Sequence, residues 1–186
     1  SKGKVWVHLV LFSIGFFFFV IGLSRPQIGA KLKEHETKGA EIMIVLDVSN
    51  SMLAEDYSPN RLERAKLAIS RIVDRLRDDR IGLILFAGDS FVQLPITTDY
   101  VSAKMFLNSI TTGSVPVQGT AIGDAINTAM RSFSVQSEKS RAIIVITDGE
   151  NHEDDPIAAA QQAAELGVRV YTIGVGSPEG KPIPMD

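Results

Sequence analysis

The sequence predicts an α/β protein with a doubly wound, mainly parallel β-sheet, one antiparallel edge strand and a transmembrane helix at the N-terminus. Three observations support this prediction: an uncharged apolar run opens the chain, four short aliphatic runs follow it, and stretches with helical spacing separate those runs. Strands that alternate with helices build an open sheet with helices on both faces. With 186 residues, the chain is long enough for one such domain and an appendage.

The opening apolar run covers residues 5–23, VWVHLVLFSIGFFFFVIGL, which are 19 residues without a formal charge. A helix of this length spans roughly 28 Å, close to the hydrocarbon thickness of a bilayer. Its apolar residues surround the whole helix, unlike the single stripe of a core helix, and the run lacks the small-residue cleavage site of a signal peptide. We therefore predict a transmembrane anchor over residues 1–28 and a polar linker over residues 29–40.

The strands are predicted from near-continuous aliphatic runs, which are typical of strands buried on both faces of a parallel sheet. These runs are Ile42–Leu46, Ile81–Phe86, Ala142–Ile146 and Val168–Val175. A shorter run, Phe91–Leu94, follows the second strand after the turn AGDS. A turn this tight indicates a hairpin, so we expect this strand to be antiparallel to its neighbour.

Helical spacing of apolar residues fills the segments between these strands. Asn60 and Glu63 resemble a capping box at the start of the first segment, and Pro156 stands where the first position of the last helix is expected. We expect helices over residues 60–77, Asp99–Ile110, Thr120–Phe133 and Asp155–Leu166.

Composition excludes several kinds of function. The chain has no cysteine, which excludes disulfides, thiolate metal sites and cysteine nucleophiles. Its three histidines argue against a zinc site built on imidazoles. The net charge of −3 gives no reason to expect binding to nucleic acid.

Oxygen-bearing side chains gather where the predicted strands end. Asp47, Ser49 and Ser51 follow the first strand, Asp148 follows the third long strand, and Thr120 stands at the start of the preceding helix. In open α/β sheets, ligands bind beyond the carboxyl ends of the strands. We therefore expect these five residues to lie at one rim of the sheet.

Two carboxylates and three hydroxyls are a ligand set suited to Mg²⁺, and Mn²⁺ or Ca²⁺ also accept oxygen ligands. Neutral hydroxyls leave the cation with uncompensated positive charge, so it can bind a carboxylate from another molecule. Gly119 and Gly149 allow the backbone to turn sharply beside the site.

Each motif taken alone has a simpler interpretation. Asp47, Ser49 and Ser51 could form a polar turn whose side chains cap backbone amides. GTAIGDA could be an ordinary helix N-cap, and TDGE an ordinary Asp-Gly turn. The occurrence of all three motifs at the same end of one sheet favours a metal site.

The motifs LDVSNSM, QGTAIGDA and ITDGE resemble the metal-ion-dependent adhesion site of von Willebrand factor type A (VWA) domains. The resemblance covers about Glu41 to Val175. It implies a Rossmann-like VWA domain over residues 41–186, truncated at its C-terminus. In this family the two serines and the threonine can bind Mg²⁺ directly, and the aspartates bind directly or through water, depending on whether the site is open or closed. The metal residues implied here are Asp47, Ser49, Ser51, Thr120 and Asp148.

The chain also resembles the membrane-anchored Bat aerotolerance proteins, particularly the B type. The resemblance rests on SRPQIG, SNSMLAEDYSPNRLERAK, FAGDSFVQLPITTDY and TDGENHEDDP. It implies a bacterial inner-membrane protein with its VWA domain on the periplasmic side. Members are often encoded beside a MoxR-type AAA+ ATPase, and they carry further transmembrane helices.

These features predict a membrane-anchored protein-interaction module and not an enzyme. Its cation would recruit an acidic residue of a partner protein, such as another Bat protein or a MoxR-type AAA+ ATPase. Met52, Leu53 and the segment AEDYSPN are expected to line the recognition surface. The alternative is a metal-dependent, phosphatase-like hydrolase with Asp47 as nucleophile. That chemistry favours a second carboxylate two positions on, where this chain has Ser49.

Overall fold

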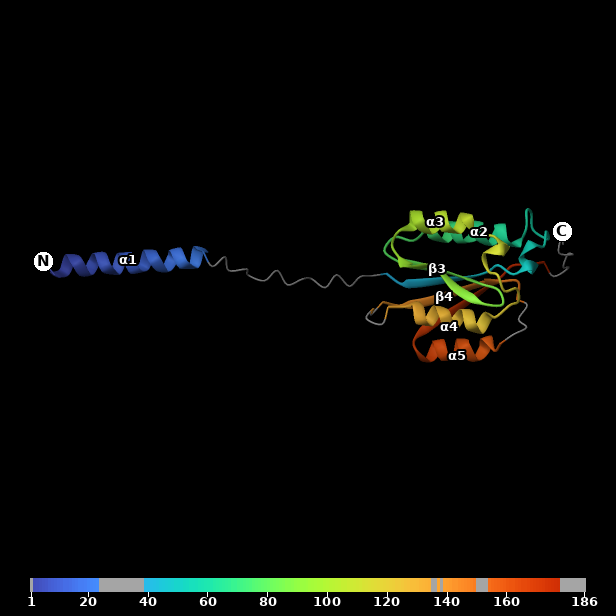
Figure 1. Ribbon diagram of the computed structural model, residues 1–186. Coiled ribbons are helices and arrows are strands. Elements are labelled where there is room, and N and C mark those ends of the chain that lie inside the picture. The colour runs from blue at the N-terminus through green and yellow to red at the C-terminus, as the bar shows by residue number, and fades with distance from the viewer. Residues whose placement is uncertain (1, 24–38, 135–136, 138, 150–153, 178–186) are drawn as a thin grey trace. The chain divides into compact units, whose positions relative to one another are not determined.

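The computed structural model of the chain describes residues 2–23, 39–134, 137, 139–149 and 154–177 (Figure 1). The chain divides into two compact units, residues 1–36 and residues 37–186.

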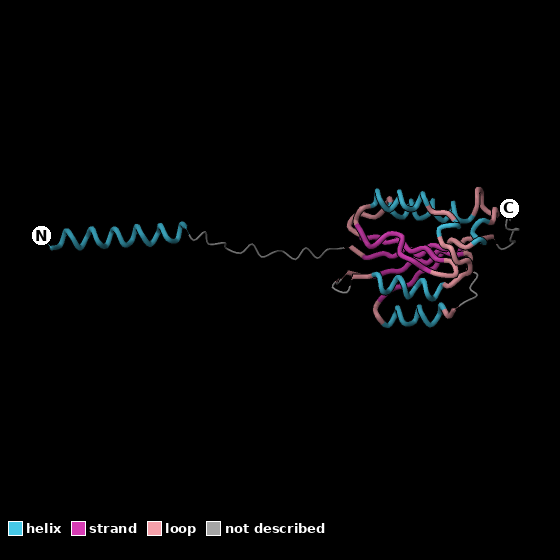
Figure 2. The backbone as a smooth tube through the Cα atoms, viewed as in Figure 1, coloured by secondary structure: helices cyan, strands magenta, loops and turns pink. Residues whose placement is uncertain are grey.

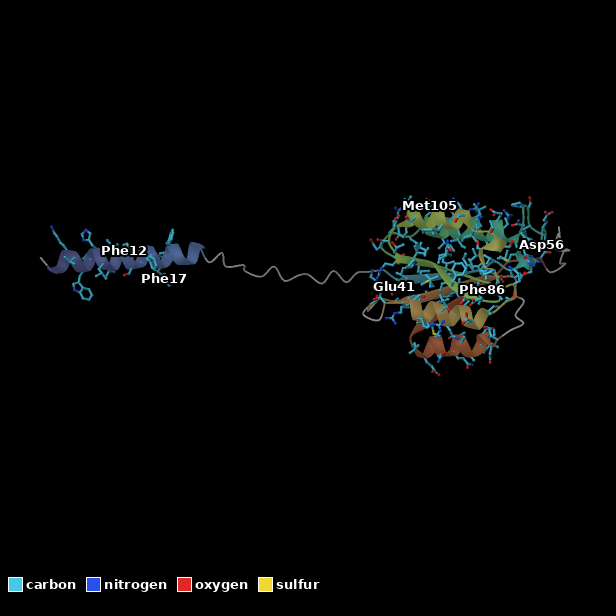
Figure 3. The ribbon with its side chains drawn as sticks, viewed as in Figure 1. Phe12, Phe17, Glu41, Asp56, Phe86 and Met105 are labelled. Atoms are coloured by element: carbon cyan, nitrogen blue, oxygen red, sulfur yellow. The ribbon has the colours of Figure 1, made fainter. Side chains whose placement is uncertain are left out.

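In the first unit, the described residues form helix α1 (Lys2–Leu23). Large apolar side chains are exposed along it, including Phe12 and Phe17 (Figure 3). The helix begins at Lys2, so Lys2 and Lys4 lie within its first turn. Among the described residues, no helix has the length and apolar character needed to cross a membrane. The predicted transmembrane anchor is thus not supported by the structure and stays a prediction. Of the predicted linker, only Gly39 and Ala40 lie within the described residues.

The second unit is built on a five-stranded sheet with the strand order β3-β2-β1-β4-β5. Four of its strands are parallel neighbours, and β3 pairs with β2 in the antiparallel sense at one edge. All five predicted strands are confirmed. Their bounds are β1 (Glu41–Asp47), β2 (Arg80–Phe86), β3 (Ser90–Thr97), β4 (Arg141–Thr147) and β5 (Val168–Gly174).

Helices cover both faces of the sheet, as expected for a doubly wound fold (Figures 1 and 2). On one face lie α2 (Arg61–Val73) and α3 (Tyr100–Ser109), and on the other lie α4 (Ile122–Ser132) and α5 (Pro156–Glu165). Two short 3₁₀ helices, η1 (Asn50–Leu53) and η2 (Thr112–Ser114), occur in the loops. Half of the predicted capping box of α2 is present, since the Asn60 side chain accepts a hydrogen bond of 2.8 Å from the Glu63 backbone amide.

The central strand β1 is buried on both faces, which explains its unbroken aliphatic sequence. Ile44 and Leu46 belong to the core that packs against α2 and α3, whereas Met43 and Val45 belong to the core beneath α4 and α5. Successive side chains of a strand point to opposite faces, so this alternation follows from strand geometry. Because β1 lies between β2 and β4 and is parallel to both, the carboxyl ends of these three strands meet at one rim.

Candidate metal centre

Asp47, the last residue of β1, is a fully buried carboxylate at this rim. Its Oδ1 accepts hydrogen bonds from the Ser49 backbone amide (2.9 Å) and the Ser49 hydroxyl (2.6 Å). Its Oδ2 accepts one from the Thr147 hydroxyl at 2.7 Å. Burial raises the pKa of Asp47, an effect opposed by the bonds from Ser49 and Thr147 and reinforced by the nearby Asp148.

The two serines after β1 converge on each other. The Ser49 and Ser51 hydroxyl oxygens lie 3.0 Å apart. Ser49 occupies the N-cap position of η1, yet its side chain makes no capping hydrogen bond and donates to Asp47 instead. The structure therefore agrees with the polar-turn interpretation only in part. The Asp47 carboxylate accepts a hydrogen bond from the Ser49 amide, as in a polar turn, but the Ser49 hydroxyl donates to the carboxylate and lies beside the Ser51 hydroxyl.

Thr120 is buried and lies just before α4. Our prediction that it starts the helix is wrong by two residues, because α4 begins at Ile122 and its N-cap is Ala121. The Ala121 amide bonds to the Ala87 carbonyl at 2.8 Å, which holds this residue out of helical conformation. The N-cap interpretation of GTAIGDA thus fails, and the Thr120 hydroxyl is not needed to cap the helix.

Hydrogen bonds hold the segment around Thr120 against the other strand ends. The Ala121 amide bonds to the Ala87 carbonyl just after β2. The Gln118 side chain accepts a hydrogen bond of 3.0 Å from the Asn50 backbone amide. The Val48 amide in turn bonds to the Phe86 carbonyl at 2.9 Å. The segment carrying Thr120 therefore reaches the rim that carries Asp47.

Asp148 follows β4 and forms an ion pair with Arg61, with 2.9 Å between Nη1 and Oδ2. The same guanidinium pairs with Asp56 at 2.9 Å between Nη2 and Oδ2. The side chains of both aspartates are 1% exposed and that of Arg61 is 11% exposed. The hydrogen bonds from Arg61, with a smaller contribution from the Ser177 amide, lower the pKa of Asp56 to about 2.

The two glycines beside the site adopt conformations that favour glycine. Gly119 has φ of 144° and Gly149 has φ of 90°. The Gly149 amide donates to the Thr147 hydroxyl at 3.1 Å, so this turn also orients a hydroxyl that bonds to Asp47.

Two residues that contact the predicted ligands, Thr147 and Arg61, were not expected from the sequence, and Asp56 was expected only as part of the recognition-surface segment AEDYSPN. Thr147 precedes Asp148, and the register that pairs Leu46 with Ile146 brings it beside Asp47. Arg61 and Asp56 come from α2 and the loop before it. The expected recognition surface also needs correction, because Met52 and Ala54 are fully buried in the core, whereas Tyr57 is 39% exposed.

The donor set fits a hard divalent cation. Asp47 is a buried carboxylate that forms no ion pair with any residue that the structure describes. A buried carboxylate without a cationic partner carries a desolvation cost, which a bound cation would offset. The described residues contain no cluster of three or more His, Cys, Asp or Glu side chains able to hold a metal. A metal here would consequently depend on the hydroxyls of Ser49, Ser51 and Thr120.

Comparison with known proteins defines the class to which this fold and rim belong. Residues 41–183 match the von Willebrand factor type A domain, and the chain belongs to this family. The predicted resemblance to the VWA family and the predicted α/β class are thereby confirmed.

Solved structures narrow the likeness further. The chain is 61% identical to the conserved hypothetical protein BatB from Bacteroides thetaiotaomicron, with a TM-score of 0.77 over 80% of this chain and 72% of that one. It is 57% identical to an aerotolerance-related membrane protein from Bacteroides fragilis, with a TM-score of 0.77 over 80% of this chain and 73% of that one. The chain spans about half the length of the curated relatives it matches.

A more distant relative bears on the metal. Proximal thread matrix protein 1 from the mussel byssus, whose structure has a zinc-occupied MIDAS motif, is 27% identical. Its TM-score is 0.65 over 76% of this chain and 37% of that one. The metal-ion-dependent adhesion site of that relative therefore accepts a divalent cation.

Proposed function

We propose that this chain is a membrane-attached protein-interaction module that binds a divalent cation at the sheet rim and recruits an acidic residue of a partner protein. The ligands would be Asp47, Ser49, Ser51, Thr120 and Asp148. The observation that carries the proposal is the buried Asp47 carboxylate, which receives hydroxyl and amide hydrogen bonds and has no cationic partner among the described residues.

The chemistry of these ligands explains why a partner carboxylate would bind. The three hydroxyls are neutral, and the two carboxylates together only balance the charge of a divalent cation. The ligands therefore place no excess negative charge around it. A carboxylate from another molecule can therefore complete the coordination at an open position. We expect Mg²⁺ as the resident cation, with Mn²⁺ or Ca²⁺ able to replace it. The zinc-occupied motif of the mussel protein supports binding of a divalent cation without selecting Mg²⁺.

A hydrolase with Asp47 as nucleophile receives less support. Such chemistry favours a second carboxylate two positions after the nucleophile as general acid, but this position is Ser49, whose hydroxyl donates to Asp47. We propose that the chain is not an enzyme. A phosphatase assay with Mg²⁺ tests this, and a turnover that disappears in Asp47→Asn would reverse the conclusion.

Membrane attachment is proposed on two grounds. The relative from B. fragilis is named a membrane protein, and α1 exposes large apolar side chains such as Phe12 and Phe17. We place the chain in the bacterial inner membrane with its VWA domain on the periplasmic side. Protease treatment of spheroplasts tests this, and a VWA domain that stays protected until the membrane is lysed would contradict it.

The partner is best sought by metal-dependent capture. We expect Asp148→Ala and Thr120→Ala to lose partner binding in a pull-down from native membranes, and EDTA to abolish binding by the wild type. Other Bat proteins or a MoxR-type AAA+ ATPase are the expected partners. Thr98→Ala is the matched control, because this exposed threonine follows β3 at the opposite end of the sheet. Unchanged binding in both variants, or equal binding in EDTA, would contradict the proposal.

A further inference from the structure

Arg61 lies between a predicted metal ligand and a second carboxylate. Its Nη1 contacts Asp148 Oδ2 at 2.9 Å, while its Nη2 and Nε contact the carboxylate of Asp56 at 2.9 to 3.1 Å. A single, partly buried guanidinium is thus shared by two carboxylates, and only one of these belongs to a predicted metal ligand.

The surroundings of Arg61 keep the guanidinium in this place. Asp56 is itself held by the Ser177 amide, at 2.7 Å. A Cβ atom added to Gly176 would lie 3.4 Å from the Arg61 Cζ, so the backbone after β5 packs closely on the guanidinium. Arg61 is also the first residue of α2, whose N-cap is formed by Asn60. Three segments therefore hold Arg61 in place. Its contact with Asp148 is made by a side chain that is restrained on several sides, unlike a mobile side chain on the surface.

A cation at the rim would meet two effects of this arrangement. It would compete with the guanidinium for the oxygens of Asp148, and the positive charge of Arg61 would repel it across a poorly solvated gap. Asp56 acts in the opposite sense, because its negative charge compensates part of the charge of Arg61.

We propose that Arg61 is a positioning residue that holds Asp148 and weakens cation binding at the rim, and that Asp56 limits this weakening. The inference rests on the proposed function, because it concerns the affinity of the same cation site. It also implies that the cation, once bound, keeps more positive charge for a partner carboxylate, since Arg61 neutralises one of its two acidic ligands.

Calorimetric titration of the full chain in detergent with Mg²⁺ tests the proposal. We expect Arg61→Gln to bind Mg²⁺ about tenfold more tightly than the wild type, within the range of changes produced by residues around metal ligands. Asp56→Asn should bind severalfold more weakly, because the full charge of Arg61 then acts on the rim. Arg64→Gln is the matched control: Arg64 lies one turn further along α2, is exposed, and should change the affinity by less than about twofold because solvent screens its charge.

The opposite signs separate this role from a merely structural one, since loss of a structural ion pair would weaken binding in both variants. Weaker or unchanged binding in Arg61→Gln overturns the inference while wild-type Mg²⁺ binding still supports the proposed function. Binding by Arg61→Gln but not by the wild type supports the inference. Absence of binding in both proteins overturns the inference and the proposed cation site together.

A double variant guards against misfolding and indirect effects. If Asp56 acts through Arg61, adding Asp56→Asn to Arg61→Gln should change the affinity little. An equal weakening by Asp56→Asn in both backgrounds overturns the role assigned to Asp56. Where Arg61→Gln does not fold, the double variant is compared with the wild type, because it leaves no unpaired charge between positions 56 and 61: tighter Mg²⁺ binding supports the inference, and weaker or unchanged binding overturns it.

Discussion

The two ends of strand β1 each carry a buried carboxylate, but the two carboxylates are stabilised differently. Glu41 begins the strand and Asp47 ends it, and both are 0% exposed. Glu41 forms an ion pair with Arg80 at 2.8 Å. Asp47 receives hydrogen bonds from Ser49 and Thr147. Figure 3 labels Glu41 at one end of the sheet and Asp56, near the metal rim, at the other.

Under the proposed function, Glu41 marks the structural end of the strand and Asp47 the end that binds a ligand. A buried charge is stable when an opposite charge and hydrogen bonds compensate its lost hydration. For Glu41, the opposite charge is that of Arg80. At Asp47 the protein supplies neutral donors, so the carboxylate keeps a raised pKa and an environment that a cation would improve.

The largest expected effect comes from Asp47→Asn. We expect this variant to lose Mg²⁺ binding at concentrations that saturate the wild type, because the central carboxylate of the rim is gone. Burial raises the folded-state pKa of Asp47 above its usual value of 3.8, so ionisation of this group opposes folding as the pH rises above that value. Without metal, the variant should therefore be more heat-stable than the wild type at pH 7.

Calorimetry with Mg²⁺ and thermal unfolding in EDTA measure these two changes. Glu41→Gln serves as the control from the other end of β1 and should retain Mg²⁺ binding. Wild-type affinity in Asp47→Asn would remove the distinction between the two ends of the strand.

The next largest effect is expected at the opposite end. Arg80→Met leaves Glu41 buried without its cation and should lower the free energy of unfolding by about 2 kcal/mol. This is less than the ~3–5 kcal/mol for a fully buried pair, because the Arg80 side chain is 35% exposed. Urea unfolding in EDTA measures the loss, with the exposed Arg75→Met as control. A change in Mg²⁺ affinity in Arg80→Met would show that the two ends are not independent.

A smaller effect is expected from the cap that precedes Arg61. Asn60→Ala removes the hydrogen bond to the Glu63 amide and should lower the free energy of unfolding by about 1 kcal/mol. Asn60→Asp, which keeps an acceptor at the N-cap, should stay close to the wild type. Urea unfolding of the two variants compares them, and an equal loss in both would mean that the cap hydrogen bond is not the cause.

The smallest effect concerns acid stability. Asp56 has a pKa of about 2 in the folded protein against 3.8 as its usual value, because Arg61 and the Ser177 amide favour its charged form. Its contribution to stability is therefore complete above pH 3.8 and is lost as the pH falls towards 2. Asp56→Asn should show a flatter pH dependence of stability in this window, measured by circular dichroism in acid. An unchanged slope would mean that protonation of Asp56 does not cause the loss of stability in acid.

Much of the fold was predictable because its signals are local. The aliphatic runs of Ile42–Leu46 and Ala142–Ile146 identify strands buried on both faces, and the apolar spacing after Asn60 identifies α2. The order of strands and helices then implies which ends share a rim, so the grouping of Asp47 with Thr120 and Asp148 could be expected before any contact was known.

The contacts within the rim could not be predicted in this way. Thr147 bonds to Asp47 because of the register between β1 and β4, which no local pattern contains. Arg61 reads in the sequence as an ordinary residue of the first helical turn, and its contacts with Asp56 and Asp148 exist only because three loops pack together. The start of α4 shifted for a similar reason, since the Ala121 amide is taken by a carbonyl outside the helix.

By itself, the sequence determined the α/β class, the positions of the strands and helices, and the gathering of oxygen side chains at one end of the sheet. Hydrophobic periodicity and the parallel direction of the strands are sufficient reasons for these features. Only the tertiary structure decided that Glu41 is paired with an arginine whereas Asp47 receives hydrogen bonds from neutral donors. Charge compensation depends on distances of a few ångströms between residues far apart in the chain, and packing alone sets those distances.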